Sequence, residues 1–249
     1  MSKKTSKINR EIENKRSHLK QLSSKRKARR VYRQTQPNLD RPLPTRKEKE
    51  SFLIICEGEN TEPDYFNHFK LKSAKIKAIG EGFNTLSLIN RAVKIVNDEK
   101  EKGLQYDQVW CVFDKDSFSD NDFNSAIKKA EDKHNFKVAY SNQAFEYWLI
   151  LHFNDHQGGA IDRKSYNKLL NSYLKQFGIE YDGSGCKKID ERFFEILEAK
   201  ENLTDKKNRQ QKALDRAEKI YNKLDHKNPA QEESSTKVFL LVTEILKNI

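Results

Sequence analysis

The sequence predicts an α/β fold with a mostly parallel sheet and helices on both faces, followed by a helical C-terminal extension. Between residues 51 and 155, short β-prone apolar runs alternate with helical patterns in the order βαβαβαβα, which is typical of parallel sheets. Residues 156–249 show helical patterns with one loop between them, and residues 1–50 have too few large apolar side chains for a core. We therefore expect a basic, flexible arm at 1–50, an α/β domain at 51–155 and an extension at 156–249 packed on it.

The N-terminal arm holds the whole excess of positive charge. The chain has 48 Lys and Arg and 37 Asp and Glu, and residues 1–50 contain 17 of the former and 5 of the latter, so they carry +12 and the remainder −1. A basic segment on a near-neutral body is typical of proteins that bind polyanions. The alternative is a solvated leader without a partner. The densest basic cluster, which we expect to contact nucleic acid, is Lys25, Arg26, Lys27, Arg29 and Arg30.

Two further patterns lie within the arm. Four aliphatic residues, at positions 8, 12, 19 and 22, can share one face of a helix when the arm is bound. Three prolines between residues 37 and 44 then indicate a linker. The globular part should begin near Ser51.

The first strands and helices of the α/β region follow from residue type and spacing. Residues 51–56 are short, β-prone and followed by Gly58, which predicts a buried strand. Residues 64–71 predict a helix, and residues 74–79 a weaker strand. Apolar residues at helical spacing predict a helix over 84–101.

The later elements continue the pattern and then change it. Residues 108–113 predict another buried strand, 120–134 a helix, 136–140 a strand and 143–153 an apolar helix. Beyond these, a loop is expected at 178–188. The predicted helices of the extension are 163–177, 190–200, 204–225 and 235–248.

Several classes of protein are excluded by composition. No apolar run reaches the roughly 18 residues that a membrane helix needs, and the N-terminus has no apolar signal-peptide core, so we expect a cytoplasmic protein without membrane contact. The three cysteines form no CxxC pair, which argues against disulfides and a Cys-based zinc site. There is no Walker A loop, GxSxG elbow or HExxH motif.

Acidic residues follow two of the predicted strands. Glu57 comes directly after the first strand, and Asp114 and Asp116 follow the third. If these strands are neighbours, the side chains meet at the carboxyl edge of the sheet, where ligands of parallel sheets gather. Converging carboxylates repel one another unless a cation neutralises them, and Mg²⁺ prefers oxygen ligands. The sequence thus predicts a Mg²⁺ (or Mn²⁺) site; the alternative is solvated turn residues and helix N-caps.

Two other glutamates are candidates for the same region. Glu146 lies in an otherwise apolar helix, where an unpaired carboxylate is costly, so it has either a site role or a structural salt bridge. Glu62 lies near the start of a predicted helix, where it either caps the helix or faces the site.

Four segments of the sequence resemble one known family. They are Phe52 to Phe66, Val112 to Phe118, Ser141 to Phe153 and Ser234 to Val238. Together they resemble RloB-like proteins, a family placed with Toprim-fold domains, over about residues 52–249. The basic arm is consistent with this family but is not diagnostic of it.

The resemblance implies specific roles. Toprim domains hold Mg²⁺ with a Glu after the first strand and an Asp-x-Asp after the third, which correspond here to Glu57, Asp114 and Asp116. The family also suggests Glu62 and Glu146 as further site residues. It is associated with bacterial anti-phage defence, often beside an AAA-type ATPase partner. The resemblance leaves the substrate open between DNA and structured RNA such as tRNA, and leaves the oligomeric state open.

Two hypotheses of function follow. The first is a Mg²⁺-dependent phosphodiesterase that cleaves nucleic acid, with Glu57, Asp114, Asp116 and Glu146 as catalytic residues and Glu57 as a candidate general base. The second is a non-catalytic subunit of a defence complex that binds nucleic acid or a partner, in which the acidic site holds only a structural ion.

Overall fold

The computed structural model describes residues 3–34, 49–78, 85–156 and 163–249. Its contacts divide the chain into two compact units, Met1–Lys47 and Glu48–Ile249. The proline-marked linker lies outside the described residues, as do residue 79 of the second predicted strand and residue 84 of the following helix.

The N-terminal unit contains one long helix, α1 (Lys3–Gln34). Every side chain from residue 11 to residue 28 is exposed, including the aliphatic Ile12, Leu19 and Leu22. This helix therefore buries no apolar face of its own within the described residues. The flexibility expected of the arm stays a prediction.

The second unit is organised around a five-stranded sheet in the order β2-β1-β3-β4-β5. Strands β1 (Phe52–Cys56), β2 (Ala74–Ala78), β3 (Gln108–Asp114) and β4 (Lys137–Asn142) are parallel. The short β5 (Ser235–Thr236) pairs antiparallel with the end of β4.

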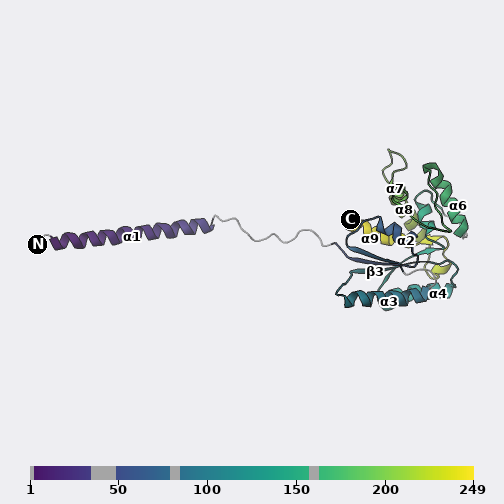
Figure 1. Cartoon of the computed structure of the whole chain (residues 1–249), viewed down its shortest axis with the longest axis horizontal. Coiled ribbons are helices and arrows are strands. Elements are labelled where there is room, and N and C mark those ends of the chain that lie inside the picture. Colours follow the sequence, from purple (N-terminus) through teal and green to yellow (C-terminus); the bar gives the residue numbers. More distant parts are fainter. Residues whose placement is uncertain (1–2, 35–48, 79–84, 157–162) are drawn as a thin grey trace. The chain divides into compact units, whose positions relative to one another are not determined.

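Helices cover both faces of this sheet, because alternate residues of its strands enter two different cores. Leu53 and Ile55 of β1 pack with α3 (Thr85–Glu101) and α4 (Asp120–Lys128). Phe52 and Ile54 pack into the larger core on the other face. Figure 1 shows α3 and α4 on one side of β3, and α2 (Thr61–Asn67) and α9 (Val238–Asn248) on the other.

The helices after β4 build the larger core. They are α5 (Glu146–Leu151), α6 (Arg163–Leu174) with a 3₁₀ turn at Lys175–Phe177, α7 (Glu191–Glu198), α8 (Arg209–Tyr221), a 3₁₀ turn at Pro229–Gln231, and α9. Buried residues of α5, α6, α7, α8 and α9 belong to the same cluster as Phe52 and Ile54, whereas Ala230 of the second 3₁₀ turn packs in the core on the other face. The extension and the sheet therefore share one apolar core.

The fold class predicted from the sequence is confirmed: a mostly parallel sheet with helices around it and a helical C-terminal part. The differences are local. The predicted helix at 120–134 begins as the α-helix α4 and continues as a π-helical turn, Lys129–Lys133. Residues 235 and 236, at the start of the last predicted helix, form strand β5 instead. In the described ranges, no helix is both long enough and apolar enough to cross a membrane.

Candidate functional site

Glu57 and Asp114 meet at the carboxyl ends of two neighbouring strands. Strand β1 pairs with β3 in the register Cys56↔Val112, so the condition for Glu57 and the aspartates to meet at one edge is fulfilled. The Glu57 N–H donates to the Val112 carbonyl at 2.9 Å. The Asp114 N–H donates in turn to Glu57 Oε2 at 3.3 Å. The carboxylates that follow the two strands thus lie close together at the carboxyl edge of the sheet.

Backbone hydrogen bonds fix the turn after β3, which contains Lys115 and Asp116. Lys115 N–H donates to the Ser141 carbonyl and Asp116 N–H to the Gln143 carbonyl, each at 2.9 Å. Asp116 has a φ of 39°, in the left-handed region that Asp tolerates better than most residues. The Lys115 side chain folds back and pairs with Asp120 at 3.4 Å. It therefore neutralises the turn rather than the acidic cluster.

Two buried glutamates from different helices join these strand ends. Glu62 on α2 and Glu146 at the start of α5 are 5% and 0% exposed. Tyr181 Oη donates to Glu146 Oε1 at 3.0 Å, whereas Glu146 Oε2 has no hydrogen-bond partner although it is buried. The Glu62 carboxylate packs directly on Gly58, where a Cβ atom would lie 2.3 Å from Oε2. Only glycine at position 58 leaves Glu62 this space.

Arg163, the first residue of α6, contacts three carboxylates, two from the turn after β3 and one from the start of α5. Its Nη1 lies 3.3 Å from Asp116 Oδ2, its Nη2 3.8 Å from Asp114 Oδ2 and its Nε 3.8 Å from Glu146 Oε2. Asp114 is also held in place by the Phe145 N–H, which donates to its Oδ2 at 3.2 Å. A guanidinium therefore provides positive charge at the point where the carboxylates converge.

Burial and mutual repulsion disfavour the ionised form of several of these acids. Burial raises the pKa of Glu57 to about 7, against the hydrogen bond from Asp114, and the charge of Glu62 adds to the rise. Burial likewise raises the pKa of Glu62 to about 7, with a further rise from Glu146. The pKa of Asp114 is raised well above its ordinary value by burial and then by Glu62. The cluster thus holds more negative charge than its surroundings readily stabilise.

The donor set suits a hard divalent cation. The acidic side chains supply carboxylate oxygens, which Mg²⁺ and Mn²⁺ prefer, and Glu146 Oε2 has no hydrogen-bond partner. Within the described residues, however, no group of three or more His, Cys, Asp or Glu side chains is arranged to hold a metal ion. Asp114 and Asp116 contact Arg163, and Glu57 accepts a hydrogen bond from the Asp114 N–H. The metal role of these three acids stays a prediction.

Sequence reasoning missed two residues of this cluster, Arg163 and Tyr181. The loop at 178–188 docks on the start of α2, where Thr61 Oγ1 donates to the Lys187 carbonyl at 2.9 Å and lies 3.0 Å from Tyr181 Oη. Tyr181 is thereby held against Glu146. Both missed residues come from the extension, and no local motif marks either of them. The one available signal was general: buried acids need a cation and a hydrogen-bond donor nearby, which indicates that such residues exist but not which ones they are.

The candidate residues for nucleic-acid binding all lie on α1. Lys25, Arg26 and Lys27 are exposed. The side chains of Arg29 and Arg30 lie outside the description. A solvent-exposed basic helix has the charge that phosphate binding needs, but contact with nucleic acid stays a prediction.

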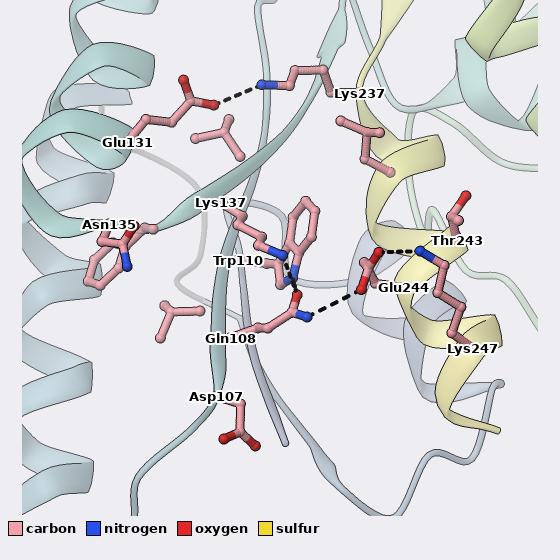
Figure 2. Close-up of a pocket in the computed structure, with 14 residues that line it drawn as sticks. Asp107, Gln108, Trp110, Glu131, Asn135, Lys137, Lys237, Thr243, Glu244 and Lys247 are labelled. Atoms are coloured by element: carbon pink, nitrogen blue, oxygen red, sulfur yellow. Dashed lines mark hydrogen bonds and ion pairs between the residues drawn. The ribbon is translucent and has the colours of Figure 1, made fainter. Parts of the chain in front are cut away.

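A separate cavity of about 500 Å³ lies at the other end of the sheet, beside the first residues of β3 and β4 (Figure 2). Lys137 Nζ donates to Gln108 Oε1 at 3.0 Å and stands 5.3 Å from the centre of the Trp110 ring. Gln108 Nε2 donates to Glu244 Oε2 of α9 at 3.3 Å. None of the acidic candidates lines this cavity. We therefore place the candidate site at the carboxyl ends of the strands, where chemistry-bearing groups converge.

A family model described as RloB-like protein matches residues 52–245. The match covers most of the chain, so the chain belongs to the RloB-like protein family, as the four sequence segments predicted. Neither the curated proteins nor the solved structures compared with the chain match it.

Proposed function

We propose that this RloB-like protein is a Mg²⁺-dependent, Toprim-type endonuclease that hydrolyses phosphodiester bonds of DNA or of RNA such as tRNA. We further propose that it acts in the cytoplasm in anti-phage defence, under the control of an AAA-type ATPase partner. The observation that carries the catalytic proposal is the meeting of Glu57 with the Asp114 turn at the ends of adjacent parallel strands. That position is where parallel sheets bind their ligands.

The chain's own carboxylates define the proposed chemistry. Glu57, Asp114 and Asp116 would hold the ion, and Glu146 would complete the site. When bound, Mg²⁺ supplies charge stabilisation to a phosphate and lowers the pKa of a bound water. Glu57 would also be the general base that accepts a proton from the attacking water. The basic residues of α1 add affinity for the phosphate backbone without selecting a sequence.

Two substitutions test the catalytic proposal. Asp114→Asn and Glu57→Gln should each abolish Mg²⁺- or Mn²⁺-dependent cleavage of labelled DNA and tRNA while circular dichroism shows a retained fold. Glu59→Gln, which removes an exposed carboxylate from the same turn, should cleave as the wild type does. Full activity in both Asp114→Asn and Glu57→Gln would end the catalytic proposal.

A second function is favoured by one observation, the presence of Arg163 among the carboxylates. If the guanidinium is their lasting counterion, the protein is a non-catalytic subunit that binds nucleic acid or a partner. The two functions are separated by incubating the protein, with and without the ATPase partner, with labelled DNA and tRNA in Mg²⁺ or Mn²⁺. Binding without metal-dependent cleavage in every combination would support the non-catalytic function.

A further inference from the structure

Arg163 forms an incomplete set of interactions with the acids around it. Of its three carboxylate contacts, only the one to Asp116, at 3.3 Å, is a hydrogen bond. The contacts to Asp114 and Glu146 are 3.8 Å long, beyond ordinary hydrogen-bond length. A permanent guanidinium–carboxylate pair in a protein interior commonly forms two parallel, shorter hydrogen bonds. Arg163 forms no such pair with any of the three acids.

The hydrogen bonding is least complete beside the most buried acid, Glu146. Glu146 is fully buried, and its Oε2 has no hydrogen-bond partner; Arg163 Nε, which faces it, also has none. A buried carboxylate oxygen left without a donor is costly. The unpartnered Glu146 Oε2 therefore indicates that a ligand binds here and that the guanidinium replaces this ligand only in part. This observation is independent of the clustering of the acids.

The Arg163 side chain also has a route away from the cluster. It is 30% exposed, whereas the Asp114 side chain is 9% exposed and that of Glu146 is 0% exposed. The guanidinium is thus more exposed than Asp114 and Glu146, although less exposed than Asp116, whose side chain is 46% exposed. Because its side chain is partly exposed, Arg163 is accessible to a phosphate from solvent.

We propose that Arg163 is an exchangeable counterion, which gives up Asp114 and Glu146 to a divalent cation and then binds a phosphate of the nucleic acid beside the site. This inference rests on the proposed function, because it assumes a cation at the acids and a polyanionic substrate. The chemistry suits both states. The charge of Arg163 balances the acids in the absence of a cation, and its planar set of donors matches two phosphate oxygens.

The first test measures cation binding without nucleic acid. The full-length wild type, Arg163→Gln and the control Lys164→Gln, which removes the same charge from the exposed neighbouring residue, are titrated with MgCl₂ by calorimetry. Because Arg163 competes with the cation, Arg163→Gln should bind Mg²⁺ at least about tenfold more tightly than the wild type. Lys164→Gln should match the wild type. Unchanged or weaker Mg²⁺ binding by folded Arg163→Gln would overturn the inference.

The second test uses Arg163→Lys, which keeps the charge and loses the planar donors. Its Mg²⁺ affinity should be close to that of the wild type, so the variant stays informative even if Arg163→Gln fails to fold. Its affinity for a short labelled oligonucleotide in Ca²⁺ should fall by about tenfold. Wild-type oligonucleotide affinity in Arg163→Lys, or Mg²⁺ binding tightened as in Arg163→Gln, would contradict the exchange.

The same titrations separate this inference from the proposed function. If the wild type and both Arg163 variants bind no Mg²⁺, the metal site itself is refuted, and the proposed function falls with it. If the wild type binds Mg²⁺ and cleaves nucleic acid but Arg163→Gln does not bind the cation more tightly, only the role of Arg163 is refuted.

Discussion

At the scale of single residues, Gly58 controls where the Glu62 carboxylate lies. A Cβ at position 58 would stand 2.3 Å from Glu62 Oε2, and the Glu62 side chain is buried. Gly58→Ala should therefore displace this carboxylate and lower the free energy of unfolding by about 1–3 kcal/mol, as overpacking does. Urea denaturation measures the loss.

A double variant controls for the backbone of the turn. Glu62→Ala removes the group that the new Cβ meets, so Gly58→Ala should cost clearly less stability in the Glu62→Ala background than in the wild type. An equal cost in both backgrounds would show that Gly58 is needed for another reason.

The raised pKa values of the glutamates predict a dependence of stability on pH. Burial moves the pKa of Glu62 and of Glu57 from 4.5 to about 7 in the folded state. Between these values the folded protein binds more protons than the unfolded chain, so the free energy of unfolding falls as the pH rises. Glu62→Gln removes one of the carboxyl groups that bind a proton more tightly in the folded state than in the unfolded state. In EDTA, its stability relative to the wild type should rise by more than about 1 kcal/mol between about pH 5 and about pH 8.

Urea unfolding of both proteins at the two pH values measures this difference. Asp64→Asn, which changes a less buried carboxyl on the same helix, is the matched control. A constant difference between Glu62→Gln and the wild type across the pH range would contradict the assignment of Glu62 as a buried, destabilised acid.

The residues of the acidic cluster differ in how far sequence could predict them. Glu57 and Asp114 follow buried strands directly, so a correct prediction of two strands was enough to bring them together. Arg163 and Tyr181 reach the same point from the extension, 106 and 124 residues after Glu57. Their approach depends on how α6 and the following loop pack, which no local pattern encodes.

At the scale of elements, the loop at 178–188 joins the extension to the α/β part through Tyr181. Its hydroxyl donates to Glu146 of α5 and contacts Thr61 of α2. Tyr181→Phe leaves a buried carboxylate oxygen without its donor, and it should lower the free energy of unfolding by about 1–3 kcal/mol. Chemical denaturation measures the change.

Tyr173→Phe is a matched control for this loss. The Tyr173 hydroxyl accepts a hydrogen bond from Asn154 at an exposed position, where solvent can replace it. Tyr173→Phe should therefore change stability by less than about 0.5 kcal/mol. A similar effect of both variants would mean that Tyr181 does not tie the loop to the cluster.

Element types were predictable where the apolar pattern was strong, and element ends were not. The strands that pair around β1 and the amphipathic α3 agree with their predicted ranges within a few residues. Strand β5 has only two residues and is defined by its pairing with β4, so no periodicity reveals it. Helix α8 begins at Arg209 rather than at residue 204, because Asn208 and Gln211 form a capping box.

At the scale of the whole molecule, the positive charge is concentrated in the N-terminal segment that contains α1, and the rest of the chain is nearly neutral. Replacing Lys25, Arg26, Lys27, Arg29 and Arg30 with Gln removes five positive charges from α1. If these residues contact phosphates, the slope of log affinity against log salt should become shallower by up to about 4.5. Fluorescence anisotropy with labelled DNA or tRNA over a range of salt concentrations measures this slope.

The control for this change alters charge on the second unit. Lys94 and Lys100 are exposed on α3, and their replacement with Gln should leave the salt slope nearly unchanged. An unchanged slope in the α1 variant would show that the helix is not the contact and that the basic arm has another role.

The most direct test of the metal site is the anomalous scattering of Mn²⁺ in crystals of the full-length protein. We predict a strong peak between Glu57 and Asp114, with carboxylate oxygens at about 2.0–2.4 Å, and Arg163 withdrawn from Asp114 and Glu146. A crystal soaked in Mn²⁺ that shows no peak there, with Arg163 still among the carboxylates, would contradict it.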